Sequence, residues 1–181
     1  MTKNRFVMTA LVLGLAAAPA LASPPEFSAD TTMVAKGQTV SGKIFVSNDK
    51  SRVETPQGIR IVRKDLQTSY LLQPEQKTYM QFPVSFSPFS EDESSRVSLG
   101  AEEVNGTTLD KFKGVFQSPK GPVAYYQWET SEGIPVMKEA EDKSWGVEYK
   151  NVQTGSQPAE LFEIPPDYQK AETPSGPGSP Q

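Results

Sequence analysis

Residues 38–47 read QTVSGKIFVS, and this stretch decides the class of fold. In an extended chain alternate side chains fall on the same face, so one face of this stretch collects Val40, Ile44 and Val46. Lys43 and Phe45 fall on the other face. The turn dipeptide Asn48-Asp49 follows directly. Alternation that ends in a turn predicts a strand of an antiparallel sheet.

The same pattern recurs along most of the chain, in segments spaced by turn residues roughly every 8 to 12 positions. Asn105-Gly106 is the dipeptide most typical of a tight hairpin. We expect short helices at most over 29–35 and after Pro83. The sequence therefore predicts a mainly β protein, a curved antiparallel sheet forming a half-open β-barrel with a few short helices or a lid segment. The predicted strands are 38–47, 51–55, 59–63, 66–72, 77–82, 102–104, 108–116, 123–130, 135–140 and 144–153.

Both ends of the chain differ from this middle part. Residues 1–22 combine Lys3 and Arg5, an apolar run and the small-residue site Ala20-Leu21-Ala22, which predicts a cleavable signal peptide. The apolar run is shorter than the roughly 20 residues of a membrane-spanning helix, so we expect no transmembrane anchor. Residues 171–181 read AETPSGPGSPQ, a composition that predicts a disordered tail. Residues 23–170 form the predicted single domain.

The chain contains no Cys and no His. The absence of both excludes disulfides, a thiolate nucleophile, Ser-His-Asp hydrolysis and metal sites built from these ligands. The acidic run Glu91-Asp92-Glu93 lacks the spacing of a calcium loop and is interpreted as a solvated charge run. A pair of carboxylates could still hydrolyse glycosides, but the sequence places no such pair. We expect a binding protein rather than an enzyme, with no metal and no cofactor.

The net charge of −4 at pH 7 becomes more negative once Lys3 and Arg5 are removed. No basic cluster with interleaved aromatic residues is present, so nucleic acid is not an expected partner. An exported chain without cysteine fits a bacterial periplasm better than a eukaryotic secretory route, where small domains usually carry disulfides. We therefore expect a soluble periplasmic protein, and a monomer.

Several short motifs follow one another in the order found in a known superfamily. They are Gly42-x-Ile44-Phe45-Val46, Ser51-Arg52-Val53-Glu54, Tyr70 with Pro74 and Tyr79, Val104-Asn105-Gly106, Ile134-Pro135-Val136 and 161–168 (LFEIPPDY). In this order the domain resembles the periplasmic outer-membrane lipoprotein carriers (LolA/LolB-like), and more closely a bacterial domain family of unknown function grouped with them. The resemblance implies a half-open barrel that reversibly binds an acyl chain or another apolar ligand. The carriers show an Arg-Pro pair shortly before a second arginine; here Asn48-Asp49 stands in the first place and only Arg52 matches the second. This departure from the pattern bears on lipoprotein transfer itself and leaves the scaffold intact.

Alternation also suggests which residues line a cavity. The candidates for the concave lining are Val40, Ile44, Val46, Ile59 and Ile61. These five would serve equally as packed core. Arg52 is a candidate for the rim, where it would pair with a lid acid or a ligand headgroup; the alternative is a solvated arginine at the end of a strand.

Aromatic residues supply the remaining candidates. Trp128 and Trp145 are expected in the cavity wall or, alternatively, in the core and in cross-strand pairs. Phe86 and Phe89 lie in the segment 83–98, which shows no alternation and is interpreted either as a flap over the cavity or as a surface loop.

Two functions remain open at this point. The first is a periplasmic binder or carrier of a hydrophobic ligand, such as a lipid or a lipidated protein. The second is an envelope sensor or accessory module that recognises a protein partner through a sheet edge, the concave face or the Pro-rich tail.

Overall fold

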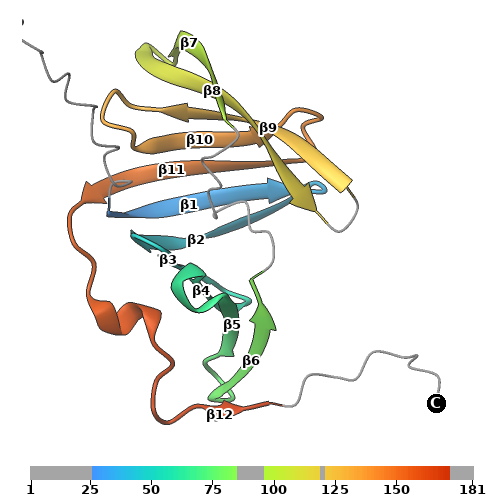
Figure 1. Ribbon diagram of the computed structural model, residues 1–181, viewed down its shortest axis with the longest axis vertical. Coiled ribbons are helices and arrows are strands. Elements are labelled where there is room, and N and C mark those ends of the chain that lie inside the picture. The colour runs from blue at the N-terminus through green and yellow to red at the C-terminus, as the bar shows by residue number, and fades with distance from the viewer. Residues whose placement is uncertain (1–25, 85–95, 119–120, 172–181) are drawn as a thin grey trace, which may run out of the picture.

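The computed structural model describes residues 26–84, 96–118 and 121–171, which form one twelve-stranded sheet (Figure 1). The strands lie in the order β12-β6-β5-β4-β3-β2-β1-β11-β10-β9-β8-β7, and every pair is antiparallel except β12 with β6. Two short 3-10 helices, η1 (Lys64–Leu66) and η3 (Ala159–Phe162), are the only helices among the described residues. The strands are β1 (Phe27–Ala35), β2 (Gln38–Ser47), β3 (Lys50–Thr55), β4 (Gly58–Arg63), β5 (Thr68–Gln73), β6 (Thr78–Pro83), β7 (Val97–Val104), β8 (Thr107–Ser118), β9 (Gly121–Glu129), β10 (Pro135–Ala140), β11 (Trp145–Thr154) and β12 (Gln169–Lys170).

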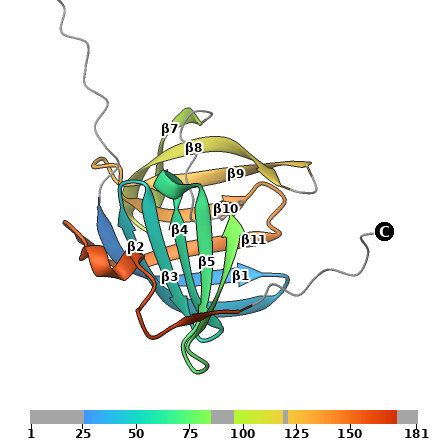
Figure 2. The same ribbon diagram turned by 60° about the horizontal axis from the view of Figure 1, so that its bottom comes forward.

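The sheet curls but does not close, because β12 and β7 lie at its two ends and do not pair. Figure 2 shows β2 to β5 in front and β8 to β11 behind them. A contact between side chains shows the same curvature. The ring centroids of Phe116 on β8 and Trp145 on β11 lie 6.1 Å apart, although β9 and β10 separate their strands. In a flat sheet, strands three places apart are separated by about 14 Å. The predicted mainly β, half-open architecture is confirmed.

Two local expectations can be compared with the structure. The helix expected over 29–35 is wrong: this segment belongs to strand β1, which pairs with both β2 and β11. The alternation of buried Phe27, Ala29 and Thr31 with half-buried residues explains why it is a strand. The predicted hairpin at Asn105-Gly106 is confirmed, since both residues have positive φ angles, 50° and 78°, as a tight primed turn requires.

The remaining expectations about segments fall outside the described residues. These are the signal peptide over 1–22, residues 85–95 of the segment 83–98 with its candidate helix or flap, and residues 172–181 of the tail 171–181. The ends of the segment 83–98 belong to strands, since Pro83 ends β6 and Val97 begins β7.

Each face of the sheet has its own apolar cluster. The inner face, which bears Ile44, carries a cluster of Phe27, Ala29, Ile44, Val53, Val147 and Tyr149. The outer face, which bears Ile61, carries a second cluster of Ile61, Leu72 and Phe162. Phe162 belongs to η3, so the outer cluster depends on a segment that is not part of the curved sheet.

That segment, residues 156–171, runs beside β3 to β6 and is called the C-terminal strap (Figure 1). Its Phe162 side chain is 1% exposed. Two outer-face arginines hold its backbone: Arg52 donates to the Leu161 carbonyl at 2.9 Å, and Arg63 donates to the Phe162 carbonyl at 3.4 Å. The strap ends in β12, which pairs with β6 and so covers that edge of the sheet.

Candidate functional site

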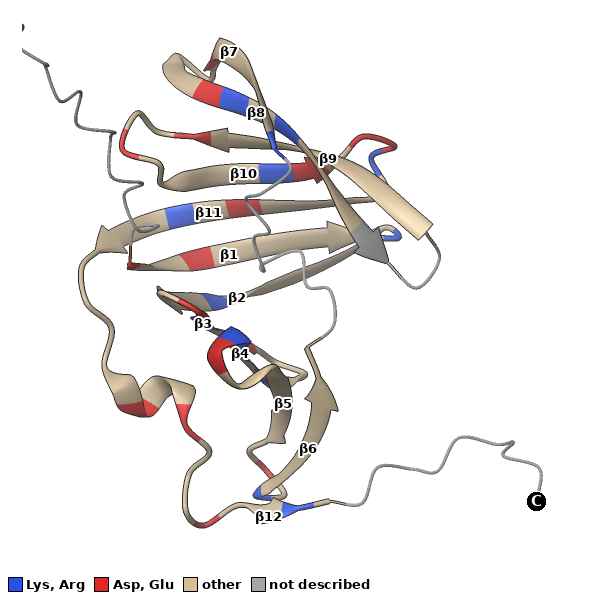
Figure 3. Cartoon of the chain, viewed as in Figure 1, with Lys and Arg blue, Asp and Glu red and all other residues tan. Residues whose placement is uncertain are grey.

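The inner face of β2 to β6 is almost free of charge. Cross-strand partners share a face, and the pairs Ile44–Val53, Val53–Arg60, Arg60–Leu71 and Leu71–Met80 trace this face across five strands. Arg60 is the only charged residue on it within these described strands. Strands β5 and β6 carry no charged residue on either face (Figure 3).

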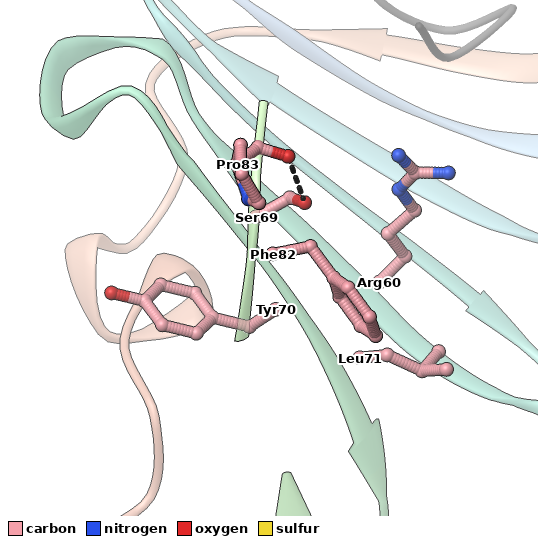
Figure 4. Close-up of a pocket in the computed structure, with 6 residues that line it drawn as sticks. All are labelled: Arg60, Ser69, Tyr70, Leu71, Phe82 and Pro83. Atoms are coloured by element: carbon pink, nitrogen blue, oxygen red, sulfur yellow. Dashed lines mark hydrogen bonds between the residues drawn. The ribbon is translucent and has the colours of Figure 1, made fainter. Parts of the chain in front are cut away.

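A pocket of about 370 Å³ lies on this face at β4, β5 and β6. Its lining residues are Arg60, Ser69, Tyr70, Leu71, Phe82 and Pro83 (Figure 4). Leu71 and Phe82 lie beside one another in the close-up and supply an apolar wall, whereas the Tyr70 ring points to the other side. The Ser69 hydroxyl donates to the Pro83 carbonyl at 3.3 Å, which ties β5 to the end of β6. The site is therefore an apolar wall with one cation at its margin.

Arg60 is partly removed from water at this position. Burial disfavours its charged form and lowers the pKa of the guanidinium below its ordinary value. An arginine nevertheless stays protonated in a protein at neutral pH. Arg60 therefore carries a positive charge at the margin of the pocket at physiological pH.

Across the curved sheet, the inner face of β9 and β10 carries buried polar and charged side chains. Gln127, Glu129 and Lys138 are all buried on the inner face of β9 and β10. The Glu129 carboxylate accepts hydrogen bonds from Arg96 and from Gln127. The Lys138 ammonium lies 4.9 Å from the centroid of the Tyr125 ring. Buried charges that have such partners fix the conformation of this wall.

The register divides the five predicted lining residues between the two faces. Val40, Ile44 and Val46 lie on the inner face, where Ile44 and Val46 pack in the central cluster. Ile59 and Ile61 lie on the outer face and pack against Phe162. The expectation that all five residues line one concave face is therefore wrong. The turn between β3 and β4 pairs Val53 with Arg60, so Arg60, rather than its two isoleucine neighbours, faces inward.

The other predicted residues are also divided. Arg52 lies on the outer face, where it donates to Glu54 at 2.6 Å and to the strap, and not at the rim of the inner face. Trp128 lies on the outer face beneath Lys111, whose ammonium is 4.8 Å from the indole ring. Trp145 lies on the inner face with Phe116. Phe86 and Phe89 fall outside the described residues.

Sequence reasoning missed Arg60, Leu71 and Phe82. The sequence contained a signal for Arg60, because it stands between two isoleucines in an alternating strand and its side chain therefore lies on the opposite face from both.

The described part of the chain contains no helix long and apolar enough to cross a membrane. No group of three or more Asp or Glu side chains within the described ranges is arranged to hold a metal ion.

The fold and its inner face define a class: a half-open antiparallel sheet with a pocket on its concave side. No protein-family model and no curated protein matches the chain. Solved structures do resemble it. MucB has a TM-score of 0.50 and 13% identity, over 80% of this chain and 59% of MucB. PNGF-II has a TM-score of 0.44 and 10% identity, over 82% of this chain and 31% of PNGF-II.

A putative outer membrane lipoprotein-sorting protein domain from Vibrio parahaemolyticus has a TM-score of 0.39 and 10% identity, over 76% of this chain and 89% of that domain. The chain spans less than two thirds of both MucB and PNGF-II. At these identities the likeness concerns the fold alone. The solved structures that resemble the chain thus include a lipoprotein-sorting domain, the kind of protein that the sequence motifs resemble.

Proposed function

We propose that this protein is a non-enzymatic binding protein that holds an apolar or lipid-like ligand on the inner face of its sheet. The single observation that carries the proposal is the pocket of about 370 Å³ beside Leu71 and Phe82. Its volume falls within the roughly 300–1,000 Å³ of small-ligand sites. Leu71 and Phe82 are only half-buried, so they keep apolar surface that a ligand can cover.

The chemistry of the lining supports binding rather than catalysis. Among the described residues, no carboxylate lines this pocket, and the Ser69 hydroxyl donates to a backbone carbonyl rather than to a general base. The proposed location is the periplasm, on the basis of the signal-like residues 1–22.

The test is a titration of the purified protein with the uncharged fluorescent probe N-phenylnaphthylamine. We expect saturable binding to the wild type. Leu71→Asn should bind the probe about tenfold or more weakly, because burial of a leucine side chain is worth about 1.5–3 kcal/mol. Leu66→Asn is the matched control, since Leu66 is 56% exposed in η1, outside the pocket. No binding by the wild type, or equal binding by Leu71→Asn, contradicts the proposal.

One observation favours a second candidate function, recognition of a protein partner at a sheet edge. Among the described strands β7 pairs only with β8, and its Val97 and Leu99 are 63% and 51% exposed. An edge strand of eight residues with open backbone groups can accept an added strand. The carboxylate of exposed Glu103 favours an extended envelope segment that carries a basic side chain.

A photo-crosslinking residue at Leu99 tests this second candidate, with the same residue at Leu66 as the control position. We expect a crosslinked envelope protein from Leu99 only. The purified partner should then slow hydrogen exchange of the β7 amides. Equal crosslinking at both positions, or unchanged β7 exchange, contradicts strand addition.

A further inference from the structure

We propose that the outer face of the sheet carries a second binding site, a small polar pocket at β2, β1 and β11 that takes one edge of a neutral sugar ring. This site lies on the face opposite the inner-face pocket, so the inference goes beyond the proposed function and does not depend on it.

The pocket has a volume of about 120 Å³. Ala29 and Ile44 belong to its lining, but their side chains pack in the inner cluster, so their backbone forms the floor of a pocket on the outer face. The register agrees, because Phe45 pairs both with Ser28 of the lining and with the outer-face Arg52. The side chains around this floor come from three strands and are Ser28, Asp30, Lys43, Phe45, Asn151 and Gln153.

A β-bulge in β11 brings Asn151 to this pocket. Ser28 pairs with Gln153 and Asp30 pairs with Lys150, so β11 has one more residue than β1 between these two pairs. Asn151 lies in this interval with a φ of 52°, a left-handed conformation that asparagine tolerates better than most residues. Its side-chain amide donates to the Asp30 carboxylate at 2.7 Å. Bulges are common where a strand turns a side chain toward a functional site.

The lining can both donate and accept hydrogen bonds. A carboxylate has about four acceptor positions, so Asp30 can accept from a ligand as well as from Asn151. The Lys43 ammonium and the Gln153 amide are exposed donors, and the Ser28 hydroxyl both donates and accepts. A ligand hydroxyl also does both, so a group of adjacent hydroxyls matches this mixed lining.

Charge and volume narrow the class of ligand. Asp30 and Lys43 are the charged residues among the described lining residues, one of each sign, which favours a neutral ligand. The volume of about 120 Å³ equals that of about four water molecules, which is room for about two or three ring hydroxyls with their carbons. Half-buried Phe45 supplies an apolar wall for the C–H groups of a ring. A neutral ring with adjacent hydroxyls and apolar C–H groups is a sugar.

The test is a titration of the wild-type protein, followed by amide NMR, with the methyl glycosides of glucose, mannose, galactose and N-acetylglucosamine. We expect at least one of them to shift the amides of Ser28, Asp30, Asn151 and Gln153 saturably at millimolar concentration. Glycerol, which has hydroxyls but no ring, and cyclohexanol, which has a ring but one hydroxyl, should give no saturable shifts there. The trisaccharide of the sugar that binds is titrated next: tighter binding identifies a glycan chain as the source, and equal or weaker binding identifies a free sugar.

Asn151→Gly should bind the same glycoside about fivefold more weakly, the effect of one neutral hydrogen bond. Glycine adopts positive φ angles readily, so the bulge remains, and amide shifts outside β1, β2 and β11 should match wild type. Asn105→Gly is the matched control, because Asn105 has a φ of 50° in the β7–β8 turn, away from the pocket. Asp30→Asn, which keeps the shape of the side chain but removes its charge, should also weaken binding about fivefold.

The inference is overturned if none of the four glycosides shifts these amides saturably. It is also overturned if glycerol shifts them as strongly as the glycosides, which would identify a hydrated notch, or if Asn151→Gly binds as tightly as wild type. None of these outcomes bears on the inner-face pocket, for which N-phenylnaphthylamine remains the test.

Discussion

Arg63 is a buried arginine that joins β4 to the C-terminal strap. It is 8% exposed, on the outer face of β4. Its guanidinium donates to Asp65 at 2.7 Å and to Glu163 of the strap at 2.6 Å. The hydrogen bond from Arg63 is the largest cause that holds the pKa of Asp65 below its ordinary value. A buried arginine remains acceptable here because carboxylates compensate its charge.

Asp65→Asn is predicted to make stability depend less on pH in the acid range. A carboxylate whose pKa is lower in the folded than in the unfolded protein stabilises the fold above about pH 5, and this contribution disappears as the pH falls through the folded-state pKa. We therefore expect wild type to be more stable than Asp65→Asn at pH 7, and the difference in unfolding free energy to shrink by about pH 3. Urea unfolding at several pH values measures it.

The control for losing one carboxylate is Glu75→Gln, in the exposed turn between β5 and β6. A difference between wild type and Asp65→Asn that stays constant from pH 7 to the acid range would show that the ion pair does not carry the effect.

Alternation in the sequence correctly predicts which residues of a strand share a face. It does not predict which face a distant segment covers. The common face of Val40, Ile44 and Val46 follows from alternation and is observed. Alternation also correctly put Ile59 and Ile61 on one face, but it does not tell which face is concave. The strap supplies Phe162 to the outer face, so these isoleucines are buried there without any cavity. Because β4 and the strap are far apart in the sequence, a local pattern cannot predict that contact.

At the scale of elements, the close approach of β2 and β3 depends on Gly42. A Cβ atom at this position would collide with the backbone carbonyl of Glu54 on β3. A backbone atom in a sheet cannot move aside as the end of a flexible side chain can. Gly42 thus allows the backbone of β3 to approach β2 closely at Glu54, although a glycine in a strand interior ordinarily weakens the strand.

Gly42→Ala is accordingly predicted to destabilise the protein by about 1–3 kcal/mol, the usual cost of overpacking. Gly146→Ala in β11 is the matched control. The nearest atom to its added Cβ would be the Lys138 carbonyl oxygen at 3.7 Å, an ordinary contact. The control should be neutral or slightly stabilising, because alanine reduces the conformational freedom of the unfolded chain. Thermal unfolding compares the two variants, and equal melting temperatures would exclude a special role for Gly42.

At the scale of the whole molecule, the two faces of the sheet have different roles. The outer face of β3 to β6 is covered by the strap, through Phe162, Arg52, Arg63 and the pairing of β12 with β6. The inner face of the same strands keeps the pocket at Leu71 and Phe82. The sequence predicted the curved sheet and contained the motif in 161–168. The packing of that motif on the outer face depends on long-range contacts that the sequence pattern does not predict. The outer face of these strands is therefore packed against the strap, whereas their inner face keeps the pocket at which we propose that a ligand binds.

This separation predicts that stability and binding can be changed independently. Phe162→Ala removes a side chain that is 1% exposed and should cost about 3–5 kcal/mol of unfolding free energy. In the fraction that remains folded, affinity for N-phenylnaphthylamine should stay within about twofold of wild type, since the strap does not line the pocket. A chain ending after Ala171 should match wild type in both measurements, because it keeps the strap and the Ala171 hydrogen bond to the Tyr79 carbonyl at 2.8 Å. Parallel loss of probe affinity and stability in Phe162→Ala, at a temperature where the variant is still folded by circular dichroism, would show that the strap and the pocket form one unit and that the two faces do not act separately.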